Sequence, residues 1–167
     1  MKNIASEVLE QFEESRATVN EIINNSNIVD QINVLIEKIS FSLSSGGKII
    51  FAGNGGSFAD SQHLSAEFVS RFLKERDPIP AIALGTNNSV LTAISNDYSF
   101  DNIFLREIMA IGKKEDVFIP ISTSGNSNNV LLATRWAKKN KIFCFGLTGK
   151  TGGELAKIVE CIKIPSE

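Results

Sequence analysis

The sequence predicts a single α/β domain, residues 1–167, built on a doubly wound parallel sheet. Five short apolar runs follow Gly47, at residues 48–52, 81–84, 117–121, 142–147 and 161–164. The stretches between these runs show helical periodicity, and no two-residue hairpin turn joins any two of them. Strands that alternate with helices form parallel sheets covered on both faces, which is why polarity does not alternate along most of the runs.

Two amphipathic helices are expected before the α/β core, at about residues 1–45, with the core over about residues 46–167. Apolar residues recur at helical spacing over residues 4–23 and, more clearly, over residues 32–43. The turn-rich residues 24–27 separate the two helices, and Gly46 and Gly47 end the second.

Composition excludes several classes of protein. The chain has 167 residues, 43% hydrophobic and 22% charged, with a net charge of −2. This charge is unlike that of a general nucleic-acid binder, and no apolar run approaches the roughly 20 residues that span a bilayer. Cys144 and Cys161 lie in apolar runs, and the N-terminus does not resemble a signal peptide. We therefore expect a cytoplasmic protein with reduced core cysteines, and neither nucleic acid nor a membrane as a partner.

The first strand is followed by a glycine-rich loop, Gly53-Asn54-Gly55-Gly56-Ser57. Glycines allow close approach of the backbone to a ligand, and Ser57 is a suitable N-cap for the helix that follows. The loop is neither a Walker loop nor the dinucleotide fingerprint, so no nucleotide cofactor is expected.

A second loop offers four hydroxyls before a helix, from Ser122, Thr123, Ser124 and Ser127. Hydroxyls, free N–H groups and a helix N-terminus bind anions without lysine, and a phosphate monoester suits them. Both loops follow strands, so both lie at the carboxyl edge of the sheet, where ligands bind. A single such loop is more simply explained as a capped turn, but two on one edge favour a phosphate site.

The helix after the first loop carries the only histidine. His63, Glu67 and Arg71 are spaced i, i+4, i+8 and are expected on one face, where Glu67 could act as a general base. The alternatives are a surface Glu67–Arg71 ion pair and a structural histidine. His63 and Glu67 could also supply two metal ligands, but a site needs a third. A separate stripe is expected to face the core: Leu64, Phe68 and Phe72.

Four stretches resemble the phosphoheptose isomerase family of sugar isomerase (SIS) domain proteins, in the family's order: residues 53–72, 93–106, 121–130 and 147–155. The resemblance covers essentially the whole chain. It implies a five-stranded, flavodoxin-like parallel sheet flanked by helices and a homotetramer packed through the N-terminal helices. It also implies the conversion of sedoheptulose 7-phosphate to D-glycero-D-manno-heptose 7-phosphate. This is the first step toward nucleotide-activated heptose for lipopolysaccharide or capsule.

The resemblance also implies roles for individual residues. Glu67 corresponds to the catalytic base, and with His63 to two ligands of the zinc, one per subunit, that some members bind. The substrate-binding positions that match are Asn54, Gly55, Gly56, Ser57, Glu67, Asn96 and Asp97. Those that match the phosphate site are Ser122, Thr123, Ser124 and Ser127.

In the family, a further helix after the last strand carries a glutamine and a histidine, which supply the partner acid and the remaining zinc ligands. This sequence ends at Glu167, and we expect the natural protein to continue into such a helix. A second hypothesis is a non-catalytic SIS module that binds a sugar phosphate or a replication-initiator-type protein. A third is an isomerase for a different ketose phosphate.

Overall fold

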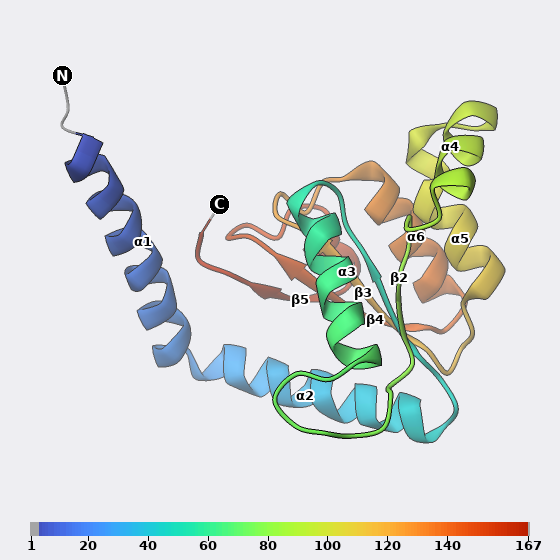
Figure 1. The fold of residues 1–167 in the computed structure, drawn as a ribbon, viewed down its shortest axis with the longest axis horizontal. Coiled ribbons are helices and arrows are strands. Elements are labelled where there is room, and N and C mark those ends of the chain that lie inside the picture. The colour runs from blue at the N-terminus through green and yellow to red at the C-terminus, as the bar shows by residue number, and fades with distance from the viewer. Residues whose placement is uncertain (1–3, 167) are drawn as a thin grey trace.

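The computed structural model describes residues 4–166 of the chain. Within this range five strands form one parallel sheet in the order β2-β1-β3-β4-β5 (Figure 1). Their bounds are β1 Ile49–Ala52, β2 Ala81–Ala83, β3 Val117–Ser122, β4 Phe143–Thr148 and β5 Glu160–Lys163. Each strand overlaps one of the five predicted apolar runs, to within one residue at each end, and all four neighbouring pairs are parallel. The predicted doubly wound sheet is confirmed.

Strand β3 is central although it contains Pro120. Pro120 pairs with Ala52 of β1, but on the β4 side the paired residues are 117 and 118, then 121 and 122. The interruption falls where proline has no N–H to donate. The strand tolerates proline because the ladder with β4 is broken at that point.

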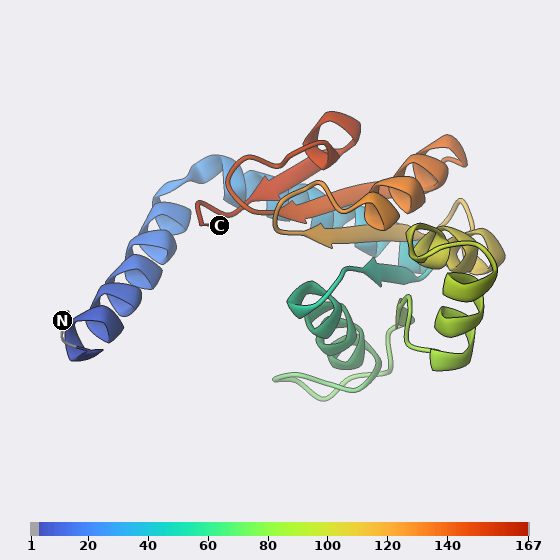
Figure 2. The ribbon, with the colours of Figure 1, turned by 90° about the horizontal axis from the view of Figure 1, so that it is seen from above.

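Helices cover both faces of the sheet (Figure 2). On one face, Ile50, Ala52 and Phe118 form a core with α4, α5 and α6, while on the other Ile49, Phe51 and Ile119 pack against α2 and α3. The helix bounds are α1 Ile4–Asn24, α2 Ser26–Ser44, α3 Gly56–Val69, α4 Asn88–Asp97, the 3-10 turn η1 Phe100–Asn102, α5 Ile103–Ile111, α6 Asn128–Lys139 and α7 Leu155–Ile158.

The first helix, α1, extends away from the α/β core and buries no residue against it (Figure 1). Its exposed apolar side chains include Ile4, Phe12 and Ile23, which are 78%, 69% and 69% exposed. Helix α2, in contrast, packs Ile28 and Leu35 against β4 and β5. An amphipathic helix whose apolar side chains are exposed away from its own core is the kind of surface that another protein chain covers.

The sheet order places the expected ligand edge between β1 and β3. The chain runs from β1 outward to β2, then returns to the far side of β1 to form β3 and continues to β4 and β5. In open α/β sheets such a reversal leaves a crevice at the carboxyl ends of the two central strands. The glycine loop, residues 53–57, follows β1, and the serine loop, residues 122–127, follows β3. The topology therefore brings both predicted loops to this crevice.

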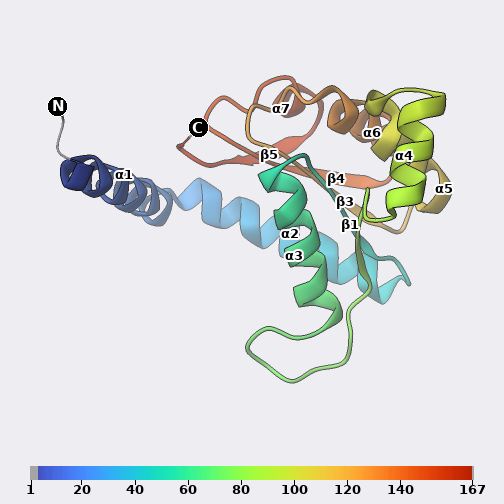
Figure 3. The same ribbon diagram turned by 45° about the horizontal axis from the view of Figure 1, so that its top comes forward.

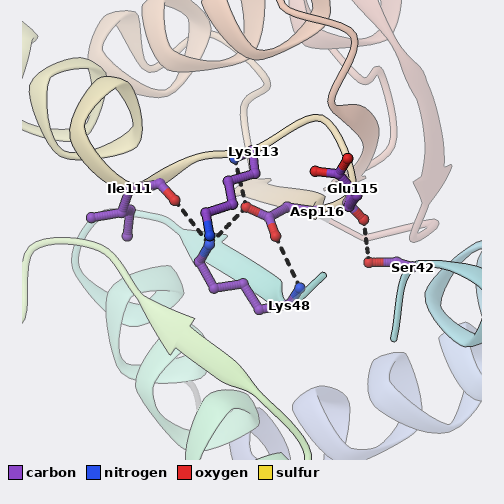
Figure 4. A network of polar contacts seen from close by, with 6 residues as sticks. All are labelled: Ser42, Lys48, Ile111, Lys113, Glu115 and Asp116. Atoms are coloured by element: carbon purple, nitrogen blue, oxygen red, sulfur yellow. Dashed lines mark hydrogen bonds and ion pairs between the residues drawn. The ribbon is translucent and has the colours of Figure 1, made fainter. Parts of the chain in front are cut away.

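The opposite, amino edge is closed by a buried polar network (Figure 4). The Asp116 side chain, 1% exposed, accepts hydrogen bonds from the backbone N–H of Lys48 at 2.9 Å and of Lys113 at 2.8 Å. It also forms an ion pair with Lys48 Nζ at 2.7 Å. The hydroxyl of Ser42 donates to the carbonyl of Glu115 at 2.6 Å. The network joins the end of α2, the start of β1 and the start of β3.

Both cysteines are buried and unpaired, as predicted. Burial raises the pKa of the Cys144 thiol to about 12 and that of Cys161 to about 11. Because thiolates are the reactive form, both thiols are unreactive near neutral pH. Among the helices within residues 4–166, none combines the length and hydropathy needed to cross a membrane.

Candidate functional site at the carboxyl edge of the sheet

The three glycines of the first loop differ in backbone conformation and in the space around them. A Cβ atom on Gly53 would lie 2.6 Å from the carbonyl oxygen of Ser57, so Gly53 lets α3 pack closely on β1. Gly55 has a φ of 54° and is the N-cap of α3, which begins at Gly56. The predicted N-cap role of Ser57 is therefore wrong: the positive φ at Gly55 starts the helix earlier, and Ser57 lies in its first turn.

Gly56 is not explained by packing. A Cβ atom on Gly56 would meet no heavy atom within 4 Å, and Gly56 is absent from the glycines with positive φ. Alanine is intrinsically better than glycine inside a helix. An open space above the first residue of α3 is where a ligand could approach the backbone.

The second loop brings its hydroxyls and free amides together before α6. The hydroxyls of Ser122 and Ser127 lie 3.1 Å apart, and Gly125 takes a φ of 65° to turn the chain between them. Within residues 4–166 the backbone N–H groups of Ser124, Ser127 and Asn128 donate to no acceptor. Unused donors at the N-terminus of a 12-residue helix attract an anion.

A pair of asparagines ties the two loops together. Asn54 donates to Asn129 at 2.8 Å, and Asn129 donates back to Asn54 at 3.0 Å. Asn129 is only 2% exposed. The sequence analysis did not single out Asn129, although it lies in the stretch 121–130. Its only signal was that it is a polar residue on the buried, mainly apolar face of α6, which also carries Thr134.

The loops enclose a cavity of about 230 Å³. It is lined by Asn54, Ser57, Ile121, Ser122, Thr123, Ser124 and Ser127. The predicted substrate contacts that the structure brings together around this cavity are Asn54, Ser57, Ser122, Thr123, Ser124 and Ser127. No charged side chain from residues 4–166 lines this cavity. A second cavity of about 430 Å³ shares Ser57 and Thr123 with the first and reaches His63.

Glu67 lies further along α3, beside His63. Glu67 Oε1 is 3.3 Å from His63 Nε2, and the two side chains are 35% and 74% exposed. The other oxygen of the carboxylate, Oε2, is buried and has no hydrogen-bond partner within residues 4–166. Both residues line a third cavity of about 390 Å³. The Glu67 carboxylate thus borders a cavity, where a group of this kind could accept a proton from a ligand.

The C-terminal end of α3 is fixed by Arg76. Its guanidinium donates to the carbonyl of Glu67 at 2.7 Å and to that of Phe68 at 2.8 Å. The chain then runs through the loop of residues 70–80 to β2 (Figure 3). Sequence reasoning missed Arg76, because a loop arginine carries no periodic signal.

Two expectations for this helix are wrong. Arg71 lies beyond the end of α3 at Val69 and pairs with Glu75 at 3.4 Å, so it does not share a helix face with Glu67. Phe72 lies beyond the same end and is 69% exposed, whereas Leu64 and Phe68 pack against the sheet as predicted.

A family model described as the SIS domain matches residues 10–149. The phosphoheptose isomerase of Rhodospirillum rubrum is 52% identical over 129 residues, which make up 77% of this chain and 69% of that protein. Phosphoheptose isomerase 2 of Campylobacter jejuni is 43% identical over 167 residues, or 99% of this chain and 83% of that protein.

A solved structure of a phosphoheptose isomerase from Neisseria gonorrhoeae matches with a TM-score of 0.91 at 35% identity. The match covers 99% of this chain and 88% of that chain. The chain belongs to the SIS domain family. Its relatives are phosphoheptose isomerases, as the sequence stretches indicated, and the chain is an isomerase that acts on a sugar phosphate.

Two predicted contacts lie apart from the cavities of this SIS domain. Asn96 and Asp97 are exposed at the end of α4, where the Asn96 amide donates to the Asp97 carboxylate at 2.8 Å. Neither lines the three cavities formed by the loops and α3. Asp101, in the turn η1 that follows α4, instead accepts a hydrogen bond at 2.7 Å from the side chain of Asn128, the first residue of α6.

His63 and Glu67 are placed together, as the predicted metal ligands would be. Within residues 4–166, however, no group of three or more His, Cys, Asp or Glu side chains is arranged to hold a metal ion. Two ligands do not form a zinc site, which needs at least three protein ligands. Zinc binding by His63 and Glu67 therefore stays a prediction.

Proposed function

We propose that the protein interconverts sedoheptulose 7-phosphate and D-glycero-D-manno-heptose 7-phosphate, the first step of nucleotide-activated heptose biosynthesis. The observation that carries the proposal is the Glu67 carboxylate, which lines a cavity and lies on the helix whose first turn borders the cavity at the serine loop. An isomerase needs an anchor for the phosphate and a base for the carbon acid, and these two features supply both.

The phosphate is bound by the serine loop. The hydroxyls of Ser122, Thr123, Ser124 and Ser127 and the free N–H groups before α6 surround its oxygens. Asn54 is held by Asn129, so its side chain serves mainly to join the loops, while Gly55, Gly56 and Ser57 contact the sugar through the start of α3.

The chemistry requires a proton to move between two carbons. Glu67 removes the proton from C1, which bears a hydroxyl beside the C2 carbonyl, and the electron pair of that C–H bond forms the enediolate. The protonated Glu67 then returns a proton to C2, while O1 loses a proton and becomes the aldehyde oxygen. The O2 oxyanion takes up a proton in turn. No residue within 4–166 is assigned as the acid that moves protons between the oxygens.

The exposed α1 and α4 residues support a homotetramer. Within residues 4–166 the apolar side chains of α1 other than Ile22 lie outside the core clusters, and Asn96 and Asp97 line none of the three cavities. We propose that α1 packs against other copies and that Asn96 and Asp97 reach the sugar in a neighbouring copy's site. Zinc binding by His63 and Glu67, and a cytoplasmic location, stay predictions.

A test incubates the protein with sedoheptulose 7-phosphate and follows the aldose by NMR. Glu67→Gln should lower kcat at least about 10²-fold, because an amide cannot accept the proton. The matched control is Glu75→Gln, which neutralises an exposed glutamate whose side chain is 84% exposed, and it should retain activity. Equal turnover by wild type and the Glu67 variant would contradict the assignment of the base.

The same experiment separates the alternatives. No turnover of any ketose phosphate, with retained sugar-phosphate binding, would favour a non-catalytic SIS module. Turnover of another ketose phosphate, but not of the heptulose, would identify an isomerase of different specificity.

A further inference from the structure

The loop between β4 and α7, residues 149–154, packs directly on the serine loop. We infer that this loop is the second half of the phosphate site and that Lys150 supplies the positive charge that the serine loop lacks. The inference rests on the proposed function, since the anion is taken to be the phosphate of the sugar. It assigns a purpose to the stretch 147–155, to which the proposed function gives no role.

Three hydrogen bonds join the two loops. Gly149 N–H donates to the carbonyl of Thr123 at 2.9 Å, and Leu155 N–H donates to the carbonyl of Gly125 at 2.9 Å. Glu154 N–H donates to Oδ1 of Asn126 at 3.0 Å. The acceptors of the serine loop are thereby bound by the neighbouring loop, whereas the N–H groups of Ser124 and Ser127 have no partner within residues 4–166.

The contact between the loops is backbone to backbone. A Cβ atom on Gly125 would overlap the carbonyl oxygen of Gly152, and one on Gly153 would overlap the carbonyl oxygen of Ser124. All three glycines have positive φ values, of 65°, 72° and 50°. The serine loop is therefore held in one conformation by a neighbour that has no side chain at the contact points.

This packing places one lysine beside the serine loop. Lys150 lines a cavity of about 350 Å³ together with Thr123, Ser124, Asn126 and Thr151. Thr123 and Ser124 also line the cavity of about 230 Å³ at the serine loop. The two cavities thus meet at the same two hydroxyl side chains.

Among the described residues, 4–166, no side chain competes for the Lys150 ammonium. Within residues 4–166 it forms no ion pair and no side-chain hydrogen bond. The carboxylate of the same loop, on Glu154, is paired with Lys157 at 2.6 Å. Because no charged residue lines the serine-loop cavity, a phosphate bound there by neutral donors would keep most of its charge of about −1.5 to −2. A free ammonium next to two of its donors compensates that charge.

Lys150 then determines specificity for the phosphorylated sugar rather than the rate of the chemistry. Its contact is with the phosphate, which is bound equally in the ground state and the transition state. Loss of such a contact raises KM and leaves kcat nearly unchanged.

The test titrates the full chain with inorganic phosphate by calorimetry. We expect Lys150→Met to raise the Kd about tenfold, the effect of losing one charge-assisted hydrogen bond, and Lys150→Arg to restore most of the affinity. The matched control is Lys163→Met, because the Lys163 side chain passes Gly152 yet lines none of the cavities at this edge. It should bind phosphate like the wild type.

A wild-type Kd in the Lys150→Met variant, an equal loss in the Lys163→Met variant, or no phosphate binding by the wild type would each overturn the inference. Kinetics with the heptulose phosphate give an independent readout, in which KM should rise about tenfold and kcat should change less than about twofold. Phosphate binding that depends on Lys150, without heptulose turnover, would refute the proposed function and support the Lys150 assignment.

Discussion

The two edges of the sheet differ in how their polar groups are satisfied. At the amino edge the buried carboxylate of Asp116 accepts three hydrogen bonds, all from residues of its own chain (Figure 4). At the carboxyl edge the backbone N–H groups of Ser124 and Ser127 have no partner within residues 4–166. Ser124 is exposed and Ser127 is half-buried, so these donors are open to a ligand. Glu67 Oε2, further along α3, also has no hydrogen-bond partner within residues 4–166. Donors left open at one edge indicate a ligand site there, whereas the polar groups of the amino edge are satisfied within the chain.

The contrast separates residues that stabilise the fold from residues that serve the site. A closed network joins α2, β1 and β3 and should matter for unfolding, but not for turnover. An open set of donors and one carboxylate oxygen should matter for binding and turnover, but little for unfolding. Substitutions at the two edges test this difference.

The largest effect on stability is expected at Asp116. Asp116→Ala leaves the partly buried Lys48 ammonium without its carboxylate and should lower the free energy of unfolding by about 3 kcal/mol. Turnover per folded molecule should stay close to wild type. Urea denaturation and an activity assay on the same preparation measure both quantities.

The control for that change is Glu115→Ala. The Glu115 carboxylate lies 3.7 Å from Lys114 Nζ, and its side chain is 33% exposed. Its loss should therefore lower the free energy of unfolding by less than about 1 kcal/mol. An Asp116 variant that keeps its stability but loses turnover would reverse the assignment of the two edges.

A smaller effect is expected at Gly56, where a substitution should change ligand affinity without lowering stability. Gly56→Ala places a methyl group in space that is empty in the chain, at the start of α3. The melting temperature should stay constant or rise, because alanine favours the helix, while the Kd for the sugar phosphate should rise about tenfold. Thermal melting and calorimetry test both parts, and unchanged affinity would show that the ligand does not approach Gly56.

The smallest effect expected is a pH dependence of stability that arises from Glu107. This carboxylate lies at the carboxyl edge and has a hydrogen-bond donor within the chain. It accepts from the N–H of Gly85 at 3.0 Å, and burial raises its pKa above the ordinary 4.5 despite that hydrogen bond. A raised pKa in the folded state means that stability falls as pH rises from the ordinary value through the folded one.

Glu107→Gln removes that titration while keeping an oxygen to accept from Gly85. As the pH rises from 4 to 7, the melting temperature of the wild type should therefore fall relative to that of the variant. Thermal melts across this range measure the difference. A difference that stays constant with pH would contradict the shifted pKa.

The sheet could be predicted from the sequence because strands covered on both faces are short apolar runs. The serine loop could be predicted because hydroxyls between a strand and a helix have a local signature. The end of α3 could not, since it depends on Arg76 folding back onto the carbonyls of Glu67 and Phe68. Asn129 was missed for a similar reason: its partner, Asn54, is distant in sequence. The start of α3 was misplaced because the backbone of Gly55, rather than the Ser57 side chain, begins the helix.

The most direct test of the carboxyl edge as the ligand site is a phosphate titration of ¹⁵N-labelled protein, followed by NMR. We expect the largest amide shifts at Ser124, Ser127 and Asn128, with little change at Lys48 or Asp116. Largest shifts at the amino edge, or none at the serine loop with phosphate bound, would contradict it.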